Sequence, residues 1–161
     1  WILLTLIERI ADNQEEVKMI TILWIACQLI KQYMFGNNTT TKLINNFLGM
    51  TTVCAMSQAF AVADRAGVDR QQLFDIMSTG PSNSPFMGFC RNYAVDGVSD
   101  LGFSINNANK DLGYFLKMVE DLNTRAQIAE STSANLQAAV DAGMGNGNVP
   151  EILDYFLKLE K

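Results

Sequence analysis

The stretch TTTKLINNFLGMTTVCAMSQAFAVADRA, residues 39–66, decides the fold of this chain. It contains no proline, and it carries apolar side chains nearly all round a helix, which is typical of a helix surrounded by other elements. At 1.5 Å per residue this helix would run roughly 40 Å. Gly67 follows as a C-cap. Small residues on about one face would let another helix approach closely: Ala55, Ala59, Ala63 and Ala66. We therefore predict one long central helix.

Beyond this helix the sequence predicts further helices and no convincing strand. Asp69, Ser84-Pro85 and Ser104 mark three helix starts, because short polar side chains cap helix N-termini and proline is tolerated in the first turn. Further helices are expected from about 126 to 142 and from about Pro150, joined by a flexible glycine-rich link at Gly143–Asn148. The helix after Ser104 is clearly amphipathic, with apolar residues at Ile105, Ala108, Leu112, Phe115, Leu116, Val119 and Leu122. The prediction is a mainly α domain of six or seven helices.

Residues 1–35 have a different pattern. Ile2–Ile7 fits a buried strand, Asp12 or Asn13 offers an N-cap for a helix from about 14 to 29, and Gln32–Phe35 fits a second short strand. Strand–helix–strand is the pattern of an α/β unit. One such unit cannot form a stable sheet alone, because both of its edges stay unpaired. The start of the chain therefore resembles a cut within a longer protein, with a domain boundary between residues 35 and 36.

Composition excludes several classes of function. The net charge is −5 and the isoelectric point about 4.6, which disfavours nucleic acid, since binding it requires a basic face. There is no histidine, so Ser-His-Asp or Cys-His catalysis and histidine-ligated metals are excluded, and we predict no metal site.

The longest apolar run, Met19–Ile30, is too short to span a bilayer. Cys27, Cys54 and Cys90 are widely spaced and predict reduced, buried packing residues. The expected location is the cytoplasm, with the mitochondrial matrix as the alternative.

A polar patch opens the central helix. Helical positions 42, 45, 46 and 49 share a face, so Lys42, Asn45 and Asn46 lie together, and Gly49 leaves space for something to approach. One interpretation is an ordinary solvated helix start. The other is a lysine that donates a proton to a carbonyl oxygen, with the asparagine amides orienting the substrate.

Two further segments also allow both a structural and a functional interpretation. Lys110 lies roughly opposite the apolar stripe of its helix, so it is either simply solvated or offers its charge to a cofactor held by another domain. Gly143–Gly147 superficially resembles a phosphate-binding loop. It follows a helix rather than a strand and lacks GxGxxG spacing, so a link between helices is the better interpretation.

Four segments in order resemble the C-terminal half of the β-hydroxyacid dehydrogenases, the group of 3-hydroxyisobutyrate dehydrogenase and tartronate semialdehyde reductase. They are GNNTTTKLINN at 36–46, AFAVADRAGVD at 59–69, NKDL at 109–112 and the closing AGMGNGNVPEIL. The resemblance covers roughly residues 3–159. It implies a 6-phosphogluconate dehydrogenase C-terminal-like helical domain at 36–161 that contributes to a homodimer, preceded at 1–35 by the last strand–helix–strand of a Rossmann domain.

The resemblance also implies roles for particular residues. The family's catalytic lysine falls on Lys42, its substrate-binding asparagine on Asn46 with Asn45 adjacent, and its cofactor-contacting lysine on Lys110. The implied reaction is hydride transfer between NAD or NADP and a small 3-hydroxy acid or its carbonyl form.

The chain departs from the family pattern at three points. Asn38 replaces a usual glycine, and Asn148 replaces a usual aspartate, which is expected to loosen the capping of the last helix. The cofactor fingerprint is absent from the sequence, so the chain alone is expected to bind neither NAD nor NADP tightly. The rival hypothesis is a non-catalytic helical dimerisation or binding module derived from the same family.

Overall fold

The structure is a computed structural model that describes the backbone of residues 14–159 and the side chains of residues 39–159. The chain divides into two compact units, Trp1–Lys42 and Leu43–Lys161. All regular elements in the described part are helical, as predicted from residue 36 onward: α2 (Gln14–Ala66), α3 (Arg70–Ser78), α4 (Pro85–Asp96), α5 (Ile105–Asp121), α6 (Gln127–Ala139) and α7 (Ile152–Lys158). A π-helical turn, Val140–Met144, follows α6, and a 3-10 turn, Val149–Glu151, precedes α7.

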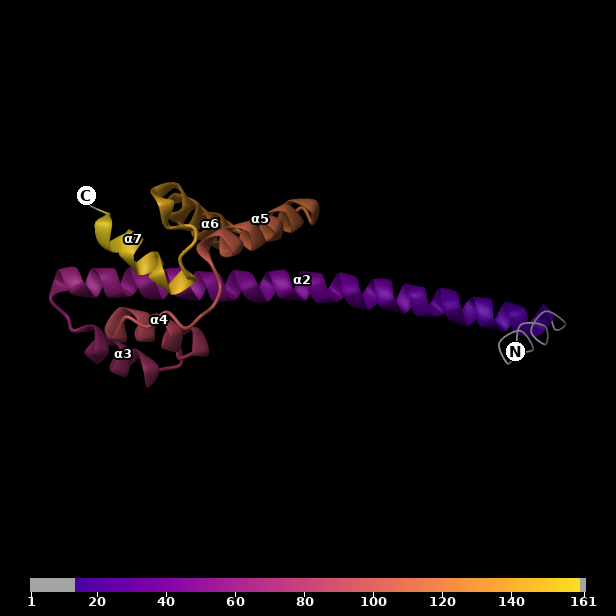
Figure 1. The fold of residues 1–161 in the computed structure, drawn as a ribbon, viewed down its shortest axis with the longest axis horizontal. Helices are drawn as coiled ribbons and strands as arrows, with labels where there is room; N and C mark the ends of the chain where they lie inside the picture. Colours follow the sequence, from indigo (N-terminus) through magenta and orange to yellow (C-terminus); the bar gives the residue numbers. More distant parts are fainter. Residues whose placement is uncertain (1–13, 160–161) are drawn as a thin grey trace. The chain divides into compact units, whose positions relative to one another are not determined.

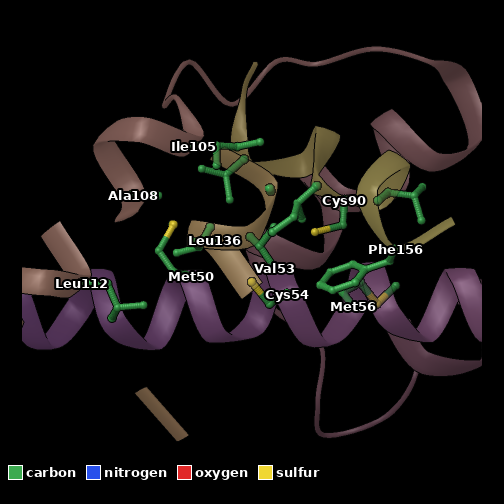
Figure 2. Close-up of a cluster of buried hydrophobic side chains, with 14 of the residues drawn as sticks. Met50, Val53, Cys54, Met56, Cys90, Ile105, Ala108, Leu112, Leu136 and Phe156 are labelled. Atoms are coloured by element: carbon green, nitrogen blue, oxygen red, sulfur yellow. The ribbon is translucent and has the colours of Figure 1, made fainter. Parts of the chain in front are cut away.

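The predicted central helix is confirmed over residues 39–66, and it ends as expected at Gly67, which has a φ of 72°. Within the second unit, Figure 1 shows α3 and α4 on one side of α2 and α5 to α7 on the other. Figure 2 shows side chains of α2, among them Met50 and Val53, meeting Ile105 of α5 and Leu136 of α6 in one apolar core. The helix is therefore the centre of this domain.

Three of the predicted helix starts are present. The Asp69 carboxylate accepts a hydrogen bond from the Gln72 backbone N–H at 2.9 Å, and the Ser104 hydroxyl accepts one from the Asn107 N–H at 3.2 Å. Pro85 opens α4. Each cap satisfies or removes an N–H that the helix itself leaves without a partner.

The predicted strand at Gln32–Phe35 is wrong, because these residues continue α2. A strand must pair its backbone groups with a neighbouring strand, whereas a helix satisfies them within itself. The described residues form no strand that could serve as that neighbour. The helix expected from about 14 to 29 therefore runs on into the central helix. The expected strand at Ile2–Ile7 and the expected caps Asp12 and Asn13 lie outside the described residues.

The segment Thr39–Ala66 is long and apolar enough to cross a membrane by length and composition alone. Half of its most apolar window is buried inside the domain, and Val53 and Phe60 are fully enclosed by the surrounding helices. Core helices of soluble proteins meet the same criterion. The packing therefore favours a core helix.

Gly49 on α2 lies against the ring of Phe86 on α4. A Cβ atom added there would lie 2.5 Å from Cζ of Phe86, so the space predicted beside the polar patch is filled by this ring. Replacing a helical glycine by alanine gains up to about 1 kcal/mol of intrinsic helix preference, while overpacking a core costs about 1–3 kcal/mol. We expect Gly49→Ala to lower the free energy of unfolding by about 1–2 kcal/mol in urea titrations.

Gly113→Ala on α5 is the matched control, because nothing lies within 4 Å of a Cβ added there. It should raise the stability by up to about 1 kcal/mol. A Gly49→Ala protein as stable as Gly113→Ala would contradict the close contact with Phe86.

Candidate functional site

A hydrogen bond joins two of the quoted sequence segments that lie 65 residues apart. The Asn46 side chain on α2 donates from Nδ2 to Oδ2 of Asp111 on α5, at 2.8 Å. Beside this bond the rings of Phe47 and Phe115 stack with their centroids 4.6 Å apart and their planes within 12°. The polar bond and the ring pair together fix how α5 lies against α2.

The position of Asp111 follows from helical periodicity. Ala108 and Phe115 precede and follow it by one turn on the buried face of α5, so Asp111 lies on that face and is only 7% exposed. A buried carboxylate is costly unless donors surround it, and Asn46 supplies such a donor. Sequence reasoning missed Asp111, although its place in the apolar stripe was a usable signal.

The other residues predicted for the site are exposed. Lys110 precedes Asp111 and points away from the domain core, as expected. Lys42 and Asn45 are exposed on α2, and Lys42 is one helical turn before Asn46. The structure thus links Asn46 to Asp111 by a hydrogen bond. Lys110 is the neighbour of Asp111 in the sequence, and both Lys110 and Asn45 lie at the surface.

The glycine-rich segment links α6 to α7, as predicted, and it is also tied by hydrogen bonds to the start of α5. Its carbonyl oxygens on Gly147 and Gly145 accept hydrogen bonds from the N–H groups of Ile105 and Asn106, both at 2.9 Å. A phosphate-binding loop offers N–H groups to its ligand, whereas this loop offers carbonyl oxygens to a helix. Its role in the described structure is to cap α5.

Two hydrogen bonds hold Asn148 in place before the 3-10 turn that leads into α7. Its backbone N–H donates to Oε1 of Glu151 at 3.0 Å, and its side-chain Nδ2 donates to the carbonyl oxygen of Ser99 at 3.4 Å. An aspartate carboxylate could not donate the second bond. The departure from the family pattern at this position therefore adds a tie to the loop before α5.

The two cysteines whose side chains are described are buried and free, which confirms their role in packing. Burial raises the pKa of both the Cys54 and the Cys90 thiol to about 12. A nucleophilic cysteine needs a lowered pKa, so neither is a candidate nucleophile. The side chain of Cys27 lies outside the described residues.

Tyr93 is a further group with a shifted pKa. Burial and its hydrogen bond to Asp154, at 2.8 Å, raise the pKa of the phenol to about 12. Tyr93 lies on α4 and Asp154 on α7, so this pair joins two helices of the domain. We assign it a structural role.

Two open grooves among the described residues lie away from the Asn46–Asp111 pair. One, of about 340 Å³, runs between α2 and α6 and includes Thr51 and Thr132, whose hydroxyls are 3.2 Å apart. Another, of about 310 Å³, lies among α2, α4 and the end of α3, and includes Met56, Met77 and Met87. Neither includes Asn46 or Asp111 in its lining. Among residues 39–159, no group of three acidic or cysteine side chains is placed to hold a metal ion.

The described residues thus form a helical domain around one central helix, in which Asn46 and the NKDL segment come together. The family described as "NAD-binding of NADP-dependent 3-hydroxyisobutyrate dehydrogenase" matches residues 36–156. The chain belongs to this family, as the sequence resemblance implied.

Similar proteins share the fold at low sequence identity. L-threonate dehydrogenase of Escherichia coli K12 is 24% identical over 121 residues, which are 75% of this chain and 40% of that protein. Solved structures include 3-hydroxyisobutyrate dehydrogenase from Salmonella typhimurium, with a TM-score of 0.66 and 24% identity over 72% of this chain and 41% of that chain. The Mycobacterium tuberculosis 3-hydroxyisobutyrate dehydrogenase solved with L-serine has a TM-score of 0.59 and 22% identity over 74% and 43%.

One similar protein is named as a nuclear factor rather than as a dehydrogenase. The cytokine-like nuclear factor N-PAC of Anopheles gambiae is 23% identical over 111 residues, which are 69% of this chain and 20% of that protein. The chain thus spans about two fifths of the length of the L-threonate dehydrogenases it matches, and less of N-PAC.

Proposed function

We propose that this chain supplies one wall of the active site of an NAD(P)-dependent dehydrogenase acting on a small 3-hydroxy acid or its carbonyl form. The observation that carries the proposal is the bond between Asn46 and Asp111, which joins the segment containing Lys42 to the segment containing Lys110. In an isolated packing module these two segments would need no polar connection, and an apolar pair would serve as well.

The roles follow from the chemistry of the side chains. When bound, the nicotinamide cofactor supplies or accepts the hydride. In reduction, the Lys42 ammonium donates a proton to the carbonyl oxygen as it gains charge. The amides of Asn45 and Asn46 orient the bound 3-hydroxy acid by hydrogen bonds. Lys110, exposed on α5, offers its positive charge to the cofactor.

The described residues could contact only part of a bound dinucleotide. They offer the Lys110 cation at the surface, but the glycine-rich segment at 143–148 presents carbonyl oxygens to α5 rather than N–H groups to phosphates. We therefore propose that a dinucleotide-binding domain, to which residues 1–35 belong, supplies the rest of the cofactor site in a longer cytoplasmic protein. The apolar side chains of Leu48 and Val62, 63% and 65% exposed on α2, support a homodimer in that protein.

A non-catalytic dimerisation or binding module is the second candidate. It is favoured by the similarity to N-PAC, which is named as a nuclear factor rather than as an enzyme. The sequence upstream of Trp1 in the gene distinguishes the two candidates, because a GxGxxG after a first strand would favour the enzyme.

Calorimetric titration with NADPH tests the proposed division of the cofactor site. The chain of residues 1–161 is expected to show no binding tighter than millimolar, because it holds only the Lys110 edge of the site. The complete polypeptide is expected to bind in the micromolar range. Micromolar binding by residues 1–161 alone would contradict the proposal that another domain holds the cofactor.

A further inference from the structure

The bond to Asp111 determines which end of the Asn46 amide faces the protein. A carboxylate oxygen only accepts hydrogen bonds, so the Nδ2 donor of Asn46 has to face it, at the observed 2.8 Å. The amide is planar, and its Oδ1 oxygen lies on the other branch, turned away from Asp111. Asn46 is partly exposed while Asp111 is buried, so the amide stands between the buried acid and the surface.

The packing of α2 against α5 keeps Asn46 and Asp111 next to each other. Phe47, the next residue on α2, stacks on Phe115, which is one turn after Asp111 on α5. Leu112, adjacent to Asp111, is fully buried in the core with Met50, one turn after Asn46. Sliding or rotating either helix far enough to separate Asn46 from Asp111 would therefore break the ring stack and open the core.

We propose that Asp111 is a positioning residue that locks Asn46 so that its amide oxygen, an acceptor, is presented to the substrate. The inference rests on the proposed function, and it specifies which substrate group Asn46 recognises. An acceptor pairs with a donor, and the hydroxyl of a 3-hydroxy acid is a donor whereas the oxygen of its carbonyl form is not. Asn46 thus favours the alcohol form over the carbonyl form.

The Asp111→Asn variant removes the carboxylate that fixes the orientation of the Asn46 amide. An asparagine at this position has nearly the same shape but can offer either an oxygen or an NH₂ group, so both orientations of Asn46 become possible. In the complete polypeptide we expect the KM for 3-hydroxyisobutyrate to rise about 3- to 10-fold, the range of one hydrogen bond. The KM for the carbonyl form and kcat should stay within about 2-fold.

Asp121→Asn is the matched control, because it removes a carboxylate from the exposed end of the same helix. It should leave both KM values unchanged. Equal rises in both KM values for Asp111→Asn, or none, would overturn the positioning role, since a merely structural effect would not distinguish alcohol from carbonyl.

A measurement on the unaltered polypeptide covers the case in which Asp111→Asn does not fold. Isobutyrate lacks the hydroxyl, and it should inhibit competitively with a constant about 3- to 10-fold weaker than the dissociation constant of 3-hydroxyisobutyrate. Equal affinity of the two acids would overturn the inference while leaving the proposed function in place. A complete polypeptide that oxidises no 3-hydroxy acid would instead overturn the proposed function, and this inference with it.

Discussion

Lys42→Ala is expected to lower kcat of the complete polypeptide by about 100-fold or more, because proton donation in the transition state typically contributes this much. Lys42 is exposed on α2, so the helix and the core beneath it should survive its loss. Circular dichroism and a urea titration would verify the fold, and steady-state reduction of the carbonyl substrate would give kcat.

Two further variants separate proton donation from charge. Lys117→Ala removes the same charge from an exposed position on α5 and should leave kcat unchanged. Lys42→Arg keeps the charge, but a guanidinium does not release its proton near neutral pH. For this variant kcat should therefore stay low, while KM stays near that of the unaltered polypeptide. Unchanged turnover in Lys42→Ala would end the assignment of Lys42 as the acid, and full activity in Lys42→Arg would reduce its role to charge alone.

The helices could be predicted where local signals sufficed. Asp69, Ser104 and Gly67 marked helix ends because capping depends on a few adjacent residues, and the apolar periodicity after Ser104 fixed the buried face of α5. The expected strand at Gln32–Phe35 failed because strand formation depends on a neighbour, and a short apolar run does not reveal whether one exists.

The site was only partly predictable for a related reason. Helical spacing singles out Lys42, Asn45, Asn46 and Lys110, and the resemblance assigns their roles. The structure adds the partner of Asn46. That partner is 65 residues away on another helix, so no local spacing could identify the pair. The tie between Gly145 and Asn106 was missed for the same reason, since glycine content alone indicated a flexible link.

Phe60→Ala is expected to lower the free energy of unfolding by about 3–5 kcal/mol, the usual cost of truncating an enclosed aromatic ring. Phe60 is 0% exposed and lies in the core cluster on α2. Because a domain of this size is stable by only about 5–15 kcal/mol, this loss would be a large fraction of its free energy of unfolding. Urea unfolding followed by circular dichroism measures it, and Phe60→Leu offers a milder variant if the alanine protein does not fold.

Val62→Ala is the matched control on the same helix, since Val62 is 65% exposed within the domain. If the domain is a monomer, this change should cost no more than about 0.5 kcal/mol, as for other surface substitutions. In the proposed homodimer the cost should be larger and should grow with protein concentration, because the free energy of association then adds to that of folding. A loss for Phe60→Ala no larger than that of Val62→Ala in the monomer would contradict a core built around α2.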